Sequence, residues 1–293
     1  MKFRNYRIIF LSLLLLILVS GAVYYYLPLR TSPEGLRIGL EKIAAADWDR
    51  RTVAPGLEHL HYHFFHLFAS PQNVNILRVA PSEPTLRMRV VAKDRSTALT
   101  SAFAREVGAV AAVNGTMFTR DKKQPLFFAR ANENAMHPLS EPAWPGKAAF
   151  GIDAEGSPFI TDKPPQGWSS IDAPDLMVGW PRLLSNGEHT DLDHTHFPWR
   201  RHPRTIVGID TEGAVYFVVI DGRTSGSRGL SLYELQFLAR GLGLVDALNL
   251  DGGGSSTMWT HEVGIVNRPS DNHRFDHQGE RPVHNVWCIL SEQ

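Results

Sequence analysis

The residues best suited to chemistry are a carboxylate followed by three glycines and two serines. Residues 249–256 have the sequence Asn-Leu-Asp-Gly-Gly-Gly-Ser-Ser. Glycine loses more backbone freedom on folding than other residues, so a glycine run is expected where the chain turns sharply or a ligand approaches closely. Consecutive backbone amides bind anions, and serine hydroxyls add donors. The stretch therefore predicts an anion-binding loop beside the carboxylate of Asp251.

A capped helix and a buried strand are predicted directly before this loop. Ser231 and Glu234 have capping-box spacing, and the apolar residues that follow recur at helical intervals as far as Gly241. Residues 245–250 then predict a short buried strand. The loop is thus expected at the end of a strand.

The same order of helix, strand and polar turn occurs earlier in the chain. Ser96 is a suitable N-cap for a helix that ends near Val107, and residues 109–113 predict a strand that leads into Asn114-Gly115. We expect the two strand ends to deliver Asn114 and Asp251 to one site.

Two arginines are expected at the ends of neighbouring strands. Arg204 precedes the predicted strand at 205–210, and a second strand at 214–220 leads into Asp221-Gly222-Arg223. Guanidinium groups are planar forks of donors that suit phosphate, although a salt bridge beside a turn is the plainer interpretation.

Five stretches in order resemble the phosphodiester glycosidase family. They are residues 112–118, 204–208, 221–223, 247–258 and the segment from Asn267 through 280–285. They span roughly residues 109–290. The resemblance implies hydrolysis of a glycosyl phosphodiester, and it implies site roles for Asn114, Arg204, Asp221, Arg223, Asp251, Gly252, Gly253, Gly254, Ser255, Ser256, Asn267, Glu280 and Arg281.

The implied reaction breaks the bond between the anomeric carbon and oxygen and expels a phosphate monoester. That leaving group needs little protonation because its second pKa is about 6. Arg204, Arg223 and the glycine amides would neutralise the departing charge. Asp251 is the first candidate for nucleophile or water-activating base, and Glu280 is the second. Polar side chains would orient the sugar or the phosphate, namely Asn114, Ser255, Ser256 and Asn267.

A serine hydrolase is a weaker interpretation of the same loop. The sequence Gly253-Gly254-Ser255-Ser256-Thr257 lacks the second glycine of a nucleophile elbow. A non-catalytic saccharide- or polymer-binding protein that assists envelope or exopolysaccharide biosynthesis is the main alternative to an enzyme.

The N-terminus has the features of a membrane anchor. Residues 8–29 carry no charge and follow Lys2, Arg4 and Arg7. That length predicts a span, and the basic residues before it predict a cytoplasmic N-terminus with the remaining chain on the periplasmic or extracytoplasmic side. A cleaved signal peptide, with secretion of the remainder, is the alternative. We expect an anchor or signal over 1–30, a linker with a short helix over 31–54, and one domain over 55–293.

Composition narrows the partners and the chemistry. Thirty basic residues balance thirty acidic ones, which argues against nucleic-acid binding, since that needs a sustained basic surface. One cysteine, Cys288, excludes an intrachain disulfide, and its apolar neighbours predict a buried strand.

No cofactor is predicted, although two groups of histidines and carboxylates leave a divalent metal open. The first group places three histidines on one face of a predicted strand, and the second lies in a polar segment. The groups are His59, His61, His63 and His66, and Asp191, Asp193, His194 and His196. The plainer interpretation of the first group is a half-buried strand, and that of the second is an exposed loop. If either group did bind a metal ion, the protein would be a metal-dependent hydrolase.

Many short strands and few helices predict an α+β fold with a mixed or largely antiparallel sheet in a single globular domain after the membrane segment. One expected strand in this fold covers residues 177–184.

Overall fold

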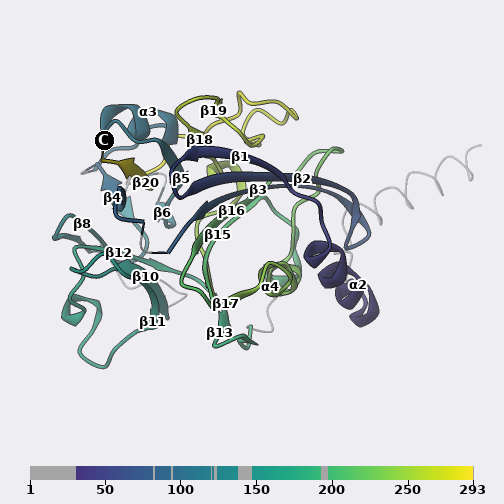
Figure 1. Cartoon of the computed structure of the whole chain (residues 1–293), viewed down its shortest axis with the longest axis horizontal. Coiled ribbons are helices and arrows are strands. Elements are labelled where there is room, and N and C mark those ends of the chain that lie inside the picture. The colour runs from purple at the N-terminus through teal and green to yellow at the C-terminus, as the bar shows by residue number, and fades with distance from the viewer. Residues whose placement is uncertain are drawn as a thin grey trace, which may run out of the picture.

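The fold is known from a computed structural model that describes residues 31–81, 83–93, 95–119, 121, 124–137, 147–192 and 197–292. Within these ranges every strand pair is antiparallel. Among the residues in these ranges, three α-helices accompany the sheets (Figure 1). This confirms the expected α+β class with its largely antiparallel sheet.

The expected membrane segment at residues 8–29 lies outside the described ranges. Among the residues that are described, no helix combines the length and the apolar character needed to cross a bilayer.

Eight strands form the largest sheet, in the order β1-β2-β3-β16-β15-β17-β13-β14. Their bounds in chain order are β1 (Asp49–Ala54), β2 (Leu57–Leu67), β3 (Ser70–Val79), β13 (Arg182–Ser185), β14 (Glu188–His189), β15 (Arg204–Asp210), β16 (Val215–Ile220) and β17 (Leu244–Asn249).

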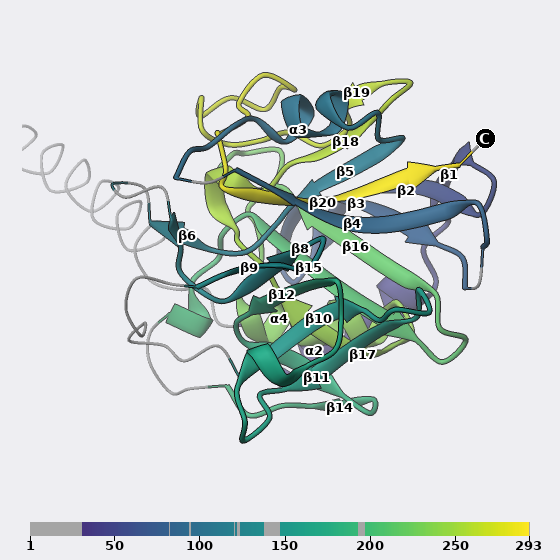
Figure 2. The same ribbon diagram turned by 90° about the vertical axis from the view of Figure 1, so that its left-hand side faces the viewer.

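Two sheets of five strands pack near the largest one (Figure 2). The first has the order β19 (Gly264–Ile265), β18 (Met258–Thr260), β5 (Ala111–Asn114), β20 (Asn285–Ser291), β4 (Leu86–Ala92). The second has the order β11 (Pro158–Asp162), β10 (Ala148–Ile152), β12 (Asp175–Gly179), β8 (Ala129–Ala131), β9 (Asn134–Met136). A small hairpin pairs β6 (Phe118–Thr119) with β7 (Gln124–Pro125), and three short 3-10 turns lie at η1 (Trp168–Ser170), η2 (Phe197–Trp199) and η3 (Gly253–Ser255).

The three large sheets share one hydrophobic core. Phe150 on β10, Phe217 on β16 and Trp287 on β20 are fully buried, and each comes from a different sheet. The ring of Phe150 lies 5.8 Å from that of Phe217 and 4.8 Å from that of Trp287, in edge-to-face contacts that aromatic pairs favour. Cys288, next to Trp287, is buried as expected, and burial raises the pKa of its thiol to about 12.

Helices α2 (Pro33–Ala44) and α4 (Leu232–Gly241) cover the other face of the largest sheet (Figure 1). The capping box predicted for α4 is confirmed: Ser231 accepts from the Glu234 amide at 3.2 Å, and Glu234 accepts from the Ser231 amide at 2.9 Å. Ile43 of α2 is buried against Gly241 of α4, where an added Cβ would lie 2.9 Å from the Ile43 Cβ.

The segment expected to be a linker, residues 31–54, contains secondary structure that packs on the domain. Ser32 caps α2 by accepting from the Gly35 amide at 3.1 Å, and α2 starts earlier than the short helix expected near residues 40–48. Strand β1 pairs with β2 along its length. The apolar face of α2, buried on α4, explains why this segment folds with the rest.

The expected strand at residues 177–184 is wrong. The structure has two strands there, β12 and β13, and they belong to different sheets. They are separated by Trp180-Pro181, and proline lacks the amide hydrogen that a continuous central strand requires.

The helix expected from Ser96 to Val107 is shorter. Helix α3 covers Thr100–Glu106, and its N-cap, Leu99, makes no side-chain capping bond. The cap comes from far along the chain, because Glu280 accepts from both the amide (2.7 Å) and the hydroxyl (2.8 Å) of Ser101.

Replacing Ser231 with alanine should lower the free energy of unfolding by about 1 kcal/mol, because the Glu234 amide loses its acceptor at the buried end of α4. Urea unfolding monitored by circular dichroism measures this change. The exposed Ser225→Ala serves as the control, and equal stability of the two variants would contradict the capping role.

Candidate active site

The site begins where strands β5 and β17 end side by side. The Asn114 Nδ2 donates to the carbonyl of Asp251 at 2.7 Å, and the Asp251 amide donates to the carbonyl of Gly115 at 3.0 Å. The structure thus brings Asn114 and Asp251 together, as the repeated helix-strand-turn order predicted. The carboxylate of Asp251 is half-buried, and its Oδ1 accepts from the Gly252 amide at 2.9 Å.

Asn114 itself is fully buried, and its amide is used inside the protein. Its Oδ1 accepts from the Thr205 hydroxyl at 2.8 Å and from the Thr257 amide at 3.1 Å. Asn114 was expected to bond a sugar hydroxyl, but in the structure its side chain holds neighbouring segments of the protein in place. Ser256 is 1 % exposed and lies in the same cluster, 3.2 Å from the Thr205 hydroxyl.

The glycine loop adopts a geometry different from a simple cradle of free amides. The Gly252 amide donates to Asp251, and the Gly253 amide donates to the carbonyl of Pro203 at 2.8 Å. Three glycine amides were expected to face an anion, and these bonds show that two of them, at Gly252 and Gly253, are used inside the protein. What the glycines provide is close approach: a Cβ at Gly252 would lie 2.7 Å from the Pro203 carbonyl oxygen, and one at Gly253 would lie 2.9 Å from Arg223 Nη2.

Two arginines lie against adjacent glycines of the loop. Arg223 is exposed, adopts φ of 65°, and lies against Gly253. Arg281 and Asp271 lie against Gly254, at positions that a Cβ there would overlap. Arg281 donates to Asp271 Oδ2 at 2.8 Å and is 3.5 Å from the hydroxyl of Ser255, which is fully buried. Cationic donors thus face the loop that follows Asp251.

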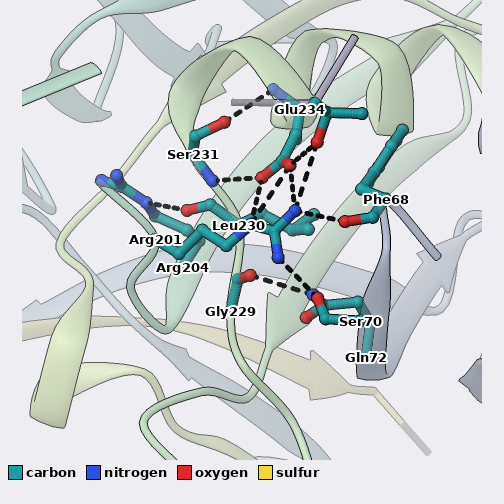
Figure 3. A network of polar contacts seen from close by, with 10 residues as sticks. Phe68, Ser70, Gln72, Arg201, Arg204, Gly229, Leu230, Ser231 and Glu234 are labelled. Atoms are coloured by element: carbon teal, nitrogen blue, oxygen red, sulfur yellow. Dashed lines mark hydrogen bonds and ion pairs between the residues drawn. The ribbon is translucent and has the colours of Figure 1, made fainter. Parts of the chain in front are cut away.

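Arg204 lies on the Gly252 side, and its guanidinium is buried. It donates to the carbonyls of Leu230 and Arg200, both at 3.0 Å, and it runs beside the network that joins Arg201 to Glu234 (Figure 3). Burial, with the neighbouring charge of Arg223, lowers the pKa of Arg204 to about 9. The group remains a cation at neutral pH, held by oxygen acceptors rather than by a direct carboxylate partner among the bonds described.

Asp221 and Asn267 hold the segment that follows the loop. Asp221 is 1 % exposed and accepts from Asn73 Nδ2 at 2.7 Å, Asn267 Nδ2 at 2.9 Å and the Arg268 amide at 2.9 Å. Burial raises the pKa of Asp221 to about 6. Asn267, also fully buried, accepts from the Met258 amide at 2.8 Å. Both residues position the backbone instead of presenting free groups to a ligand.

Glu280, the carboxylate expected as the second catalytic group, makes its hydrogen bonds to helix α3. Glu280 caps α3 through Ser101, as described above, and burial raises its pKa. Sequence analysis missed Asp271, the carboxylate that does contact the glycine loop with Arg281. Nothing local marks Asp271, because it lies in a polar segment that only the fold brings beside Gly254.

His202 was also missed, although it lies two residues before Arg204. Burial, followed by the charges of Arg204, Arg223 and Arg200, lowers the pKa of His202 to about 4. A neutral imidazole among three arginines indicates a strongly positive environment on this side of the loop.

Two of the histidines considered as possible metal ligands contact asparagines. His59 contacts Asn75 at 3.1 Å, and His61 contacts Asn73 at 2.8 Å. The described residues contain no group of three or more His, Cys, Asp or Glu side chains placed to hold a metal ion. Asp193, His194 and His196 lie outside the described ranges.

Comparison with known proteins gives the family of the chain and agrees with the fold. A family model described as phosphodiester glycosidase matches residues 107–290, and the chain belongs to this family. A similar curated protein is N-acetylglucosamine-1-phosphodiester alpha-N-acetylglucosaminidase of Mus musculus, 40% identical over 88 residues. That alignment covers 29% of this chain and 16% of the mouse protein. The protein of the same name from Bos taurus is 36% identical over 88 residues, 29% of this chain and 16% of its own length.

Solved structures share the fold. The zebrafish N-acetylglucosamine-1-phosphodiester alpha-N-acetylglucosaminidase catalytic domain, auto-inhibited by its pro-peptide, superposes with a TM-score of 0.64 at 20% identity, over 82% of this chain and 85% of that one. A hypothetical protein from Synechocystis gives a TM-score of 0.66 at 15% identity, over 84% of this chain and 64% of that one.

Stability should fall faster with acid in the wild type than in His202→Gln. The unfolded chain protonates this histidine below its ordinary pKa of about 6.5, whereas the folded chain does so only near pH 4. Stability is therefore unaffected by His202 above pH 6.5 and is lost as the pH falls from 6.5 towards 4. Between pH 7.5 and pH 5 the midpoint of thermal unfolding should drop by about 2–4 °C more in the wild type. Equal drops would contradict the buried neutral state.

Proposed function

We propose that the domain hydrolyses the bond between the anomeric carbon and oxygen of a glycosyl-1-phosphodiester, releasing a free sugar and a phosphomonoester. The observation that carries the proposal is the half-buried Asp251 carboxylate at the end of β17, directly before a loop flanked by Arg223 and Arg281. An anionic group beside cationic donors suits a substrate whose bond breaks to leave a cation-like sugar carbon and an anionic phosphate.

Asp251 acts on the sugar side in this proposal. An oxocarbenium-like centre is stabilised by a nearby carboxylate, which either attacks the carbon or activates a water molecule. The bonds from Asn114 and to Gly252 fix the backbone and one carboxylate oxygen of Asp251, which limits the reorganisation needed when charge develops.

The arginines act on the phosphate side. Arg223 and Arg281 lie against adjacent glycines, so their guanidinium groups can reach one phosphate that rests on the loop. Asp271 orients Arg281 through a hydrogen bond of 2.8 Å. The phosphate monoester leaves without needing an acid because its second pKa is about 6, which fits a site where Glu280 is engaged with Ser101.

One observation supports the alternative that the domain binds a saccharide without cleaving it. Glu280, the second carboxylate expected for catalysis, has both oxygens bonded to Ser101, and a binding protein needs only the recognition half of the site. We further propose that residues 8–29 anchor the domain on the extracytoplasmic side of a membrane, where envelope saccharides are substrates; a cleaved leader predicts the same side.

The variant Asp251→Asn should lose most of its turnover and keep its affinity for the substrate. With the full chain and an N-acetylglucosamine 1-phosphodiester, kcat should fall by roughly 10²–10⁴-fold while the dissociation constant changes little. Release of free sugar and phosphomonoester measures the rate, and the anomer of the sugar distinguishes attack from water activation. Asp172→Asn, at an exposed site, is the matched control. Absence of turnover in the wild type across a panel of sugars, with binding intact, would favour the binding protein.

Arg223→Ala should lower kcat/KM by about 10–100-fold, because one fork of phosphate donors is removed from the loop. Arg223 is chosen over Arg204 because Arg223 is exposed, whereas the buried Arg204 guanidinium holds the carbonyls of Leu230 and Arg200. The exposed Arg37→Ala on α2 controls for net charge. A value of kcat/KM equal to that of the control would place the phosphate elsewhere.

A further inference from the structure

Three rings form a column next to the candidate active site. The Trp180 and Phe197 rings lie 5.6 Å apart at 32°, and the Phe197 and His202 rings lie 6.2 Å apart at 27°. Phe197 is 40% exposed, so part of its side chain is accessible to a ligand. The reaction proposed above uses neither Trp180 nor Phe197.

One end of the column is fixed to the strand that carries Asp251. The Trp180 amide donates to the Asn249 carbonyl at 2.9 Å, and Asn249 Nδ2 donates to the Trp180 carbonyl at 2.7 Å. Asn249 is two residues before Asp251. The end of β12 also lies beside the turn that follows β5, since the Thr116 hydroxyl donates to the Val178 carbonyl at 2.5 Å. Trp180 therefore sits where β5, β12 and β17 converge.

The other end of the column reaches the glycine loop through Arg204. The guanidinium carbon of Arg204 lies 5.3 Å from the Phe197 ring centroid. The Cδ of the same arginine is 3.7 Å from the position of a Cβ at Gly252. The buried Arg204 consequently lies between the Phe197 ring and Gly252, and the next residue of the loop, Gly253, lies against Arg223.

A buried acceptor accompanies the rings. Asn249 is 1 % exposed, and its Oδ1 has no hydrogen-bond partner among the described residues, while its Nδ2 is used by Trp180. Buried side-chain acceptors are normally satisfied, because an unmade bond costs free energy. A hydroxyl donor from a ligand would satisfy this one.

We propose that the Trp180–Phe197 column is the subsite for the sugar ring of the substrate, and that Asn249 Oδ1 accepts a hydrogen bond from a ring hydroxyl. This inference rests on the proposed function. It assigns the sugar of the substrate to the rings and the phosphate to the arginines. A hexopyranose has a face of C–H bonds that stacks on aromatic rings and a rim of hydroxyls for polar groups. Sites of this kind combine aromatic walls with a few placed acceptors. The ligand class is a neutral hexopyranose, N-acetylhexosamines included.

The test separates the two halves of the substrate. Binding of free N-acetylglucosamine, glucose, mannose and galactose, and separately of inorganic phosphate, is measured by calorimetry on the full chain. Phe197→Ala and Trp180→Leu should each weaken binding of the preferred sugar about tenfold, with phosphate affinity unchanged. The matched control is Phe65→Ala, which removes another aromatic ring, 84% exposed, from β2. Thermal unfolding establishes that each variant is folded; Phe197 is the safer position because Trp180 also packs on buried side chains.

The outcomes distinguish this inference from the proposed reaction. Loss of sugar binding with phosphate binding intact supports the subsite, even if the wild type hydrolyses no phosphodiester. Equal loss of sugar and phosphate binding overturns it, because Phe197 would then act only by supporting Arg204. Wild-type affinity for the sugar in the folded Phe197→Ala variant overturns it as well, and so does a wild-type protein that binds no sugar of the panel.

Discussion

The Asn114 side chain is the contact on which the site depends. It joins the end of β5 to the backbone of Asp251, to Thr257 and to the hydroxyl of Thr205, so one buried amide fixes segments from two sheets. Neither sheet could position the carboxylate alone, because β17 belongs to the eight-stranded sheet and β5 to a five-stranded one. A buried polar group is tolerated only when its bonding capacity is filled, which ties the position of Asp251 to correct packing of both sheets.

Charge is distributed unevenly in a chain whose formal net charge is zero. Arg200, Arg204 and Arg223 act together on His202, and Arg281 lies against Gly254 of the loop. The buried Arg204 donates to the carbonyls of Leu230 and Arg200, and it lies beside Arg201, which pairs with Glu234 of the α4 capping box (Figure 3). A local field of this kind attracts an anion without a basic surface elsewhere.

Sequence patterns anticipated those parts of the fold that depend on neighbouring residues. The capped helix α4, strand β17, the loop after it and the meeting of Asn114 with Asp251 follow from local spacing. Patterns failed where a distant partner decides the outcome. Glu280 bonds Ser101 across 179 positions, and Asp271 reaches Gly254 only in the folded chain. The apolar run at 177–184 hides a change of sheet, because residues of two buried strands look alike in sequence. The role of the glycines was also misjudged, since hydrogen bonds made by their amides cannot be read from composition.

Because Cys288 is buried, its reaction with a thiol reagent can report local opening of the sheet around it. The thiol lies in β20, between β5 and β4, and a pKa of about 12 leaves almost no thiolate at neutral pH in the native state. A thiol reagent can therefore react only when this sheet separates. The labelling rate of the unaltered chain consequently reports how often the sheet that holds Asn114 comes apart, on a timescale that equilibrium unfolding does not sample.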